Sequence, residues 1–346
     1  MKYPRFKTMI RTGASLAVFF LLGALCMWLL VSQGVLPHRK FSLDGKPLRE
    51  GGYKLINPLL LCSSPSQPSS GVFAPLKKRL DQFIKSRIGD GSADTISVYF
   101  RDLLTGRWVG NNEKENYTPA SLLKVPIMVA FLKAAESNPA LLSKKILYDG
   151  SFDYNAIEGI KPLRSVVSGR SYTLDELLNL MIVYSDNNAY GLLFKNIDQN
   201  LLVEVYTDLG LSVPPHDGAT VDFMSPKIYS SFFRILYNAT YLDRQSSEKA
   251  LELLSESNFP QGIRSGVLSG VTVAEKFGER TQSSSGGTVE KRELHDCGIV
   301  FYPGHPYLLC VMTSDLPPTD FNNLADIIRG ISALTYQEVK ALQTAE

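Results

Sequence analysis

Apolar residues recur along this chain with two different spacings, and the two spacings predict different elements. Spacing by threes and fours, as at Leu76, Leu80 and Ile84, is typical of a helix with one buried face. This spacing predicts helices over 74–88, 121–136, 174–183, 188–196, 201–209, 226–237 and 320–342. Alternation and short apolar runs bounded by turn residues predict strands over 95–102, 107–110, 271–277, 297–302 and 307–313.

The order of these elements indicates how they are arranged. A helix and two strands come first, a block of helices follows, and three strands and a long helix come last. Strands from both ends of the chain can then form one sheet. We therefore predict an α+β fold, with an antiparallel five-stranded sheet flanked by the terminal helices and a second lobe made only of helices.

A third pattern occupies the N-terminus. No charged residue occurs between Arg11 and His38, and this run exceeds the ~20 residues that a membrane helix needs. Four basic residues and no acidic ones precede it, so the positive-inside rule places the N-terminus in the cytoplasm. We expect four parts: a cytoplasmic tail at 1–11, a single-pass transmembrane anchor at 12–37, an extracytoplasmic stalk at 38–71 and a globular domain at 72–346.

Two other interpretations of the apolar run are open. A cleaved signal peptide has an apolar core of about 7–15 residues and a small-residue exit site, which this run lacks. A lipid-anchored Cys26 is disfavoured because Leu25 precedes it where such sites usually carry a small residue. Within the stalk, residues 63–71 are typical of a serine- and proline-rich linker, whereas the apolar 53–61 fits a short strand or a docking segment.

Composition narrows the function classes. The chain has 346 residues and a formal net charge of +2, so no strong attraction to nucleic acid is expected. Its four cysteines match no zinc-ligand or C-x-x-C spacing, and nothing indicates a metal or organic cofactor. Cys297 and Cys310 lie in consecutive apolar runs and are either cross-strand disulfide partners or free buried thiols. We favour free thiols, because unpaired cysteine is commonly buried.

Ser121 and Lys124 form the first candidate for chemistry. They start a predicted helix just after Pro119, and one helical turn separates them, so both side chains project from the same face. A serine hydroxyl needs a base to become a nucleophile, and a lysine in a dry pocket can be that base. The apolar surroundings of Lys124 favour this interpretation over a capping serine with a surface lysine.

Ser185-Asp186-Asn187 separates two predicted helices. Ser185 could relay a proton to a leaving group, and Asn187 could orient Lys124 and hold a substrate amide. Asp186 is more typical of a residue that braces the loop through backbone hydrogen bonds. Taken alone, this string is also an ordinary polar turn.

Lys276-Phe277-Gly278 ends a predicted strand. Lys276 could bind a substrate carboxylate there, and Gly278 would let a substrate backbone approach the strand edge. The backbone N–H groups of Ser121 and Glu279 would then form an oxyanion hole. The alternative is an ordinary strand end with a surface lysine.

Together and in this order, the three strings resemble the serine β-lactamase and penicillin-binding protein superfamily, and class A β-lactamases most closely. The stretches 119–126, 185–189, 295–300 and 309–313 also look like parts of that family, and the resemblance covers about 72–340. It implies an α/β sandwich beside an all-α lobe, with the site in the cleft between them. The implied catalytic residues are Ser121, Lys124, Ser185 and Asn187, and the implied substrate-binding residues are Lys276, Gly278 and Glu279.

The chain departs from the family's pattern at two places. Class A enzymes carry a loop glutamate that activates the deacylating water, but the corresponding stretch 210–226 contains none. Asp217 and Asp222 are its remaining carboxylates, and a loop carboxylate is more often solvated or capping. Phe277 stands where a hydroxyl would help Lys276 to hold a carboxylate. We therefore expect either weaker recognition of penicillin or an apolar surface that contacts a different acyl group.

Three functions fit these observations. The first is a membrane-anchored serine hydrolase of β-lactamase type that acylates Ser121. The second is a D,D-peptidase or transpeptidase of cell-wall stem peptides, for which the missing glutamate is an argument. The third is a non-catalytic sensing domain, against which the intact polar residues argue. The expected partners are a small-molecule β-lactam or a peptidoglycan peptide, and the membrane through the N-terminal helix.

Overall fold

The computed structural model describes residues 48–61, 71–214, 221–317 and 320–343. The predicted tail and transmembrane anchor lie outside these residues. None of the helices in the described ranges combines the length and the hydropathy that crossing a bilayer requires.

One five-stranded antiparallel sheet lies at the centre of the fold, with the strand order β4-β3-β9-β8-β7. Its strands are β3 (Thr95–Asp102), β4 (Trp108–Asn111), β7 (Val273–Ser283), β8 (Val289–Val300) and β9 (Tyr307–Asp315). Every residue of β9 is buried, because this central strand is covered on both faces. The predicted sheet built from both chain ends is confirmed. Strands β7 and β8 run further than predicted, because polar residues in their outer halves interrupt the apolar pattern.

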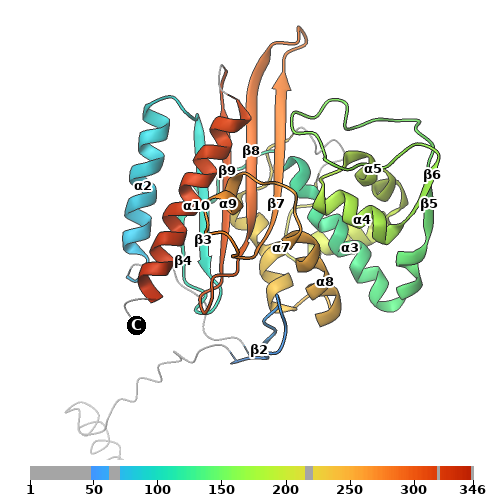
Figure 1. Ribbon diagram of the computed structural model, residues 1–346, viewed down its shortest axis with the longest axis horizontal. Helices are drawn as coiled ribbons and strands as arrows, with labels where there is room; N and C mark the ends of the chain where they lie inside the picture. The colour runs from blue at the N-terminus through green and yellow to red at the C-terminus, as the bar shows by residue number, and fades with distance from the viewer. Residues whose placement is uncertain (1–47, 62–70, 215–220, 318–319, 344–346) are drawn as a thin grey trace, which may run out of the picture. The chain divides into compact units, whose positions relative to one another are not determined.

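The terminal helices α2 (Ala74–Gly89) and α10 (Phe321–Gln343) cover one face of the sheet, as Figure 1 shows. Their apolar stripes, which include Leu80 and Ile328, belong to one buried cluster with Phe100 of β3. The amphipathic spacing in the sequence therefore does place both helices on the same core, as predicted.

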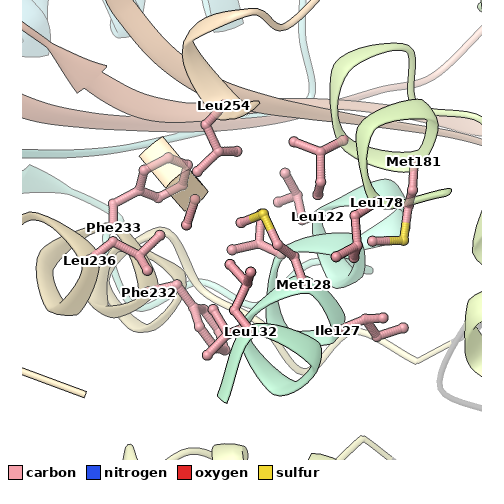
Figure 2. Packing of buried hydrophobic residues seen from close by; sticks show 14 of the residues in the cluster. Leu122, Ile127, Met128, Leu132, Leu178, Met181, Phe232, Phe233, Leu236 and Leu254 are labelled. Atoms are coloured by element: carbon pink, nitrogen blue, oxygen red, sulfur yellow. The ribbon is translucent and has the colours of Figure 1, made fainter. Parts of the chain in front are cut away.

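The remaining helices form a lobe on the other side of the sheet (Figure 1). They are α3 (Lys124–Ser137), α4 (Leu174–Val183), α5 (Asn187–Asn196), α6 (Gln199–Asp208), α7 (Pro226–Asn238) and α8 (Arg244–Ser255). Helix α3 is the buried centre of this lobe, because its side chains from Val125 to Leu132 are all buried. Figure 2 shows Met128 and Leu132 between the side chains of α4 and those of α7 and α8.

Several short elements complete the fold, and most of them were not predicted. They are the 3-10 helices η1 (Ala120–Leu123) and η2 (Pro139–Ser143), the short helix α9 (Gly262–Ser265), and the strand pair β5 (Lys145–Tyr148) and β6 (Arg170–Thr173). Helix α8 was also missed. Its mean hydropathy is low because only one face is apolar, with Ala250, Leu251 and Leu254 buried.

An N-terminal segment docks on this lobe. Strands β1 (Leu48–Arg49) and β2 (Leu59–Leu61) pair with each other, and Leu55 and Ile56 between them are buried. The carboxylate of Glu248 accepts three backbone N–H bonds from residues 54–56, at 2.9–3.1 Å. Residues 48–61, which the sequence analysis places in the stalk, therefore pack against the domain, as the docking interpretation of 53–61 expects.

The cysteine interpretation needs a correction. Cys297 of β8 and Cys310 of β9 are direct partners in the strand register, and they form a disulfide. Both are fully buried. The free-thiol interpretation is wrong because the hairpin register sets the two side chains face to face, which apolar spacing alone does not reveal.

Candidate active site

Ser121 lies in the short helix η1, at the head of the buried helix α3. The preceding residue, Ala120, has a φ of 49°, a left-handed conformation that costs a residue with a side chain roughly 1–2 kcal/mol. The hydroxyl of Tyr229 donates to the backbone oxygen of Leu122 at 3.0 Å and holds the segment from the lobe side. The surrounding structure thus fixes the backbone of Ser121 against its local preference.

Gly278 brings the edge strand β7 close to this segment. A methyl group on Gly278 would lie 2.9 Å from the backbone oxygen of Pro119 and 3.2 Å from the backbone nitrogen of Leu122. Real side chains do not fit at such distances, so glycine is required here. The close approach is to the protein's own chain, whereas the sequence analysis assigned the space to a substrate.

Lys124 is the centre of the hydrogen bonds in the site. Its side chain is 2% exposed, and its Nζ donates to Ser121 Oγ at 2.8 Å and to the backbone oxygen of Ser185 at 2.6 Å. A further bond joins Nζ to Asn187 Oδ1. Burial lowers the pKa of Lys124 to about 7, although nearby carboxylates oppose this shift. Near neutral pH a neutral amine is therefore available to accept the proton of Ser121.

Ser185 connects the helical side of the site to the strand side. Its φ is 58°, and its Oγ accepts from Lys124 Nζ at 3.1 Å and from Lys276 Nζ at 2.9 Å. Lys276 is fully buried; burial, together with the charge of Lys124, holds its pKa well below the ordinary value. Both lysines thus share one hydroxyl, which is positioned to pass a proton between them and a bound leaving group.

Asp186 lies between these functional residues but points away from them. It caps helix α5 through Asn188 N at 2.9 Å and accepts from Val166 N at 2.9 Å and from Asn155 Nδ2 at 2.7 Å. The side chain is fully buried. Asp186 therefore braces the turn, as predicted, and this fixed turn orients Ser185.

On the strand side of the site, the side chain of Phe277 does not face the substrate position that the sequence analysis expected. Phe277 is only 5% exposed, and its ring stacks on that of Phe259, with the centroids 4.2 Å apart. Asp296, its partner across the β7–β8 pair, is fully buried. Phe277 thus belongs to the core and offers little surface to a substrate, and the hydroxyl that contacts Lys276 is that of Ser185.

Glu158 reaches the site from the loop between β5 and β6. Asn187 Nδ2 donates to Glu158 Oε1, and burial together with the charge of Glu158 raises the pKa of nearby Glu279. Glu279 is 8% exposed and accepts from the backbone nitrogen of Ile160 at 2.7 Å. Sequence reasoning missed Glu158, because it stands alone in a loop without a motif. The only available signal was the long interval without a predicted element before 174.

Asp217 and Asp222 are the two carboxylates of 210–226 that could replace the missing glutamate. Asp217 lies outside the described residues. Asp222 accepts from Thr118 Oγ1 at 2.5 Å and pairs with Lys291 at 3.5 Å. Neither contact is with the proposed nucleophile or its lysine, so the structure gives Asp222 a bracing position.

A serine hydroxyl hydrogen-bonded to a buried amine, beside a second serine and a second lysine, defines a site for serine acyl transfer. The protein belongs to the beta-lactamase enzyme family, whose model matches residues 75–339. It is thus a β-lactamase-like serine hydrolase, and the predicted family and fold are confirmed.

Individual relatives share sequence or fold with this chain. A β-lactamase of Streptomyces albus G is 24% identical over 240 residues, which cover 64% of this chain and 73% of that protein. Among solved structures, PBP-A superposes with a TM-score of 0.63 at 21% identity, covering 80% of this chain and 98% of its own. A class A β-lactamase from Mycobacterium abscessus superposes with a TM-score of 0.62 at 23% identity, covering 76% and 98%.

Proposed function

We propose that this protein is a membrane-anchored serine hydrolase that forms an acyl-enzyme on Ser121 with a β-lactam or a peptidoglycan-type amide. The observation that carries the proposal is the 2.8 Å hydrogen bond between Lys124 Nζ and Ser121 Oγ in a buried site. The neutral amine of Lys124 takes the hydroxyl proton, and Ser121 Oγ attacks the carbonyl carbon of the amide. The backbone N–H groups of Ser121 and Glu279 hold the resulting oxyanion.

Collapse of this intermediate needs a proton on the leaving nitrogen. Ser185 Oγ lies within hydrogen-bonding distance of both Lys124 and Lys276, so it donates its proton to the nitrogen and is reprotonated from a lysine. Asn187 orients Lys124 through Oδ1, and its amide nitrogen is the group for a substrate carbonyl. Lys276 and Gly278 complete the strand side of the site.

A D,D-peptidase or transpeptidase of stem peptides is the second candidate, and the lack of a glutamate in 210–226 favours it. Hydrolysis of an acyl-enzyme requires a base positioned for water. Transfer to an amine requires an acyl-enzyme that persists until the amine arrives, and the neutral Lys124 can then take the proton that the amine loses. A mutant of PBP-A, one of the similar structures, is an acyl-enzyme complex with penicillin G. A persistent acyl-enzyme is therefore the outcome we expect here.

The proposed location is the cytoplasmic membrane, with the catalytic domain outside. Two observations support it. The uncharged run at 12–37 has the length of a membrane anchor. The buried disulfide between Cys297 and Cys310 is typical of an oxidising compartment.

Intact-protein mass spectrometry of the purified full-length protein over a time course with benzylpenicillin tests the chemistry. A lasting adduct on Ser121, absent in Ser121→Ala, supports the peptidase type. Penicillin consumption with only a transient adduct supports a β-lactamase with a base outside 210–226. If no adduct forms and no penicillin is consumed, the result contradicts penicillin chemistry and leaves the sensing domain as the remaining candidate.

A further inference from the structure

A closed loop crosses from the helical lobe to the edge of the sheet. We call its residues 155–161 the strap. Lys161 Nζ donates to the backbone oxygen of Asn155 at 2.7 Å, which joins the two ends of the strap. Asn155 Nδ2 donates to Asp186 Oδ1 at 2.7 Å, so the base of the strap is fixed to the turn that holds Ser185. Figure 1 shows this loop, drawn in green, between the helical lobe and strand β7.

The tip of the strap is seated on the strand side of the site. The backbone nitrogen of Ile160 donates to Glu279 Oε1 at 2.7 Å, and the Ile160 side chain packs against the cluster that contains Phe277. A methyl group on Gly159 would lie 2.5 Å from the ring of Phe321 and 3.2 Å from both carboxylate oxygens of Glu279. The strap therefore spans the cleft, from the turn at Asp186 to β7 and α10.

Glu158 is the residue of the strap that enters the site. Its carboxyl group accepts from Asn187 Nδ2, while Asn187 Oδ1 is already bonded to Lys124. The amide donor that a substrate carbonyl needs is thus occupied by the protein itself. The neighbouring residue Ile157 is 90% exposed, so the outer face of the strap is free of packing that would hold it down.

Glu158 also faces Glu279. Burial raises the pKa of Glu279 to about 7, and Glu158 adds to this shift against the opposing bond from Ile160 N. The cations that face the pair are Lys124 and Lys276, and neither carboxyl group forms an ion pair with a described residue. The hydrogen bond from Ile160 N to Glu279 is therefore the contact that seats the strap on β7.

We propose that the strap is a latch that closes the Ser121 site, with Glu158 competing with the acyl donor's carbonyl for the amide of Asn187. An acyl donor gains this amide only when it displaces Glu158, so Glu158 determines which donors react. The acylation rate is then proportional to the fraction of molecules in which the strap is open. The effect on acylation rests on the proposed function, whereas the closed strap does not.

Three variants of the full-length protein separate the contacts of the latch. Glu158→Ala removes the hydrogen bond from Asn187 and is expected to open the strap. Glu158→Gln retains this bond, because its amide oxygen accepts from Asn187, so it is expected to stay closed. Gly159→Val retains Glu158 but unseats the tip against Phe321. Ile157→Ser is the matched control, since this side chain points to solvent.

Two readouts are measured for each variant: amide hydrogen exchange of the 155–163 peptide, and the rate of Ser121 acylation by benzylpenicillin. In Glu158→Ala and Gly159→Val we expect protection of the Ile160 amide to be lost and acylation to rise by about tenfold, as for one lost charged hydrogen bond. Glu158→Gln and Ile157→Ser should match the parent in protection.

The outcomes are decisive even if the proposed function fails. Unchanged protection in both opening variants would overturn the latch. Lost protection with an unchanged or lower acylation rate would show that the strap does not compete with the acyl donor. If the parent forms no acyl-enzyme, the exchange measurement still decides whether Glu158 holds the strap closed.

Discussion

The helical side of the active site and its strand side differ in how they use polar groups. On the helical side, Ser121, Ser185 and Asn187 all bond directly to the buried amine of Lys124. On the strand side, Phe277 turns into the core and Glu279 binds the strap. The apparatus that activates a nucleophile is therefore complete, while the surface that would recognise a substrate carboxylate is not. Activation and recognition are separable properties of this site.

The largest effect should come from removing the amine on the helical side. Lys124→Met keeps the length of the side chain but removes the base, and we expect acylation of Ser121 to slow by about 10²–10⁴-fold. The rate of adduct formation by mass spectrometry measures this loss. Lys133→Met is the control, because Lys133 bonds to Glu136 and to the backbone of Tyr241 outside the site. Equal losses in both variants would refute the role of Lys124.

The same contrast explains how much the sequence predicts. Ser121 and Lys124 are one helical turn apart, and Ser185-Asp186-Asn187 lies between two clear helices, so local spacing makes both strings visible in the sequence. The strand side depends on long-range contacts instead. The inward turn of Phe277 depends on Phe259, and the strap reaches Glu279 from residues 119 positions earlier in the chain. Such contacts leave no periodic pattern in the sequence.

A pH profile should sharpen the assignment of the helical side. Acylation needs the neutral amine of Lys124, and burial lowers its pKa to about 7. The rate should therefore rise with pH, by roughly tenfold between pH 6 and pH 8, and then level off. Single-turnover acylation with benzylpenicillin at constant ionic strength measures the profile. A rate that falls over this interval would mean that the protonated form is the active one.

A smaller gain is expected from repairing the strand side. Phe277→Thr restores a hydroxyl next to Lys276, and one such hydrogen bond to a penicillin carboxylate should accelerate acylation by about twofold to tenfold. Both this variant and Phe277→Ala lose the stacking on Phe259, which costs about 3–5 kcal/mol of stability for a buried Phe→Ala change. Phe277→Ala is thus the matched control for the cavity. If both variants acylate at the same rate, the missing hydroxyl is not what limits penicillin recognition.

The smallest effect on acylation should come from a site remote from both sides of the cleft. Glu248 on α8 accepts the backbone N–H groups of residues 54–56, so Glu248→Ala should lower the free energy of unfolding by about 1–3 kcal/mol. The acylation rate should stay unchanged, because the docked segment does not touch Lys124. Glu252→Ala, an exposed residue of the same helix, should change neither property. Urea denaturation and adduct formation measure the two quantities on the same samples. A slower acylation rate in Glu248→Ala would mean that the stability of the lobe and the geometry of the helical side are coupled. The slower rate of Lys124→Met could then no longer be assigned to its missing amine alone.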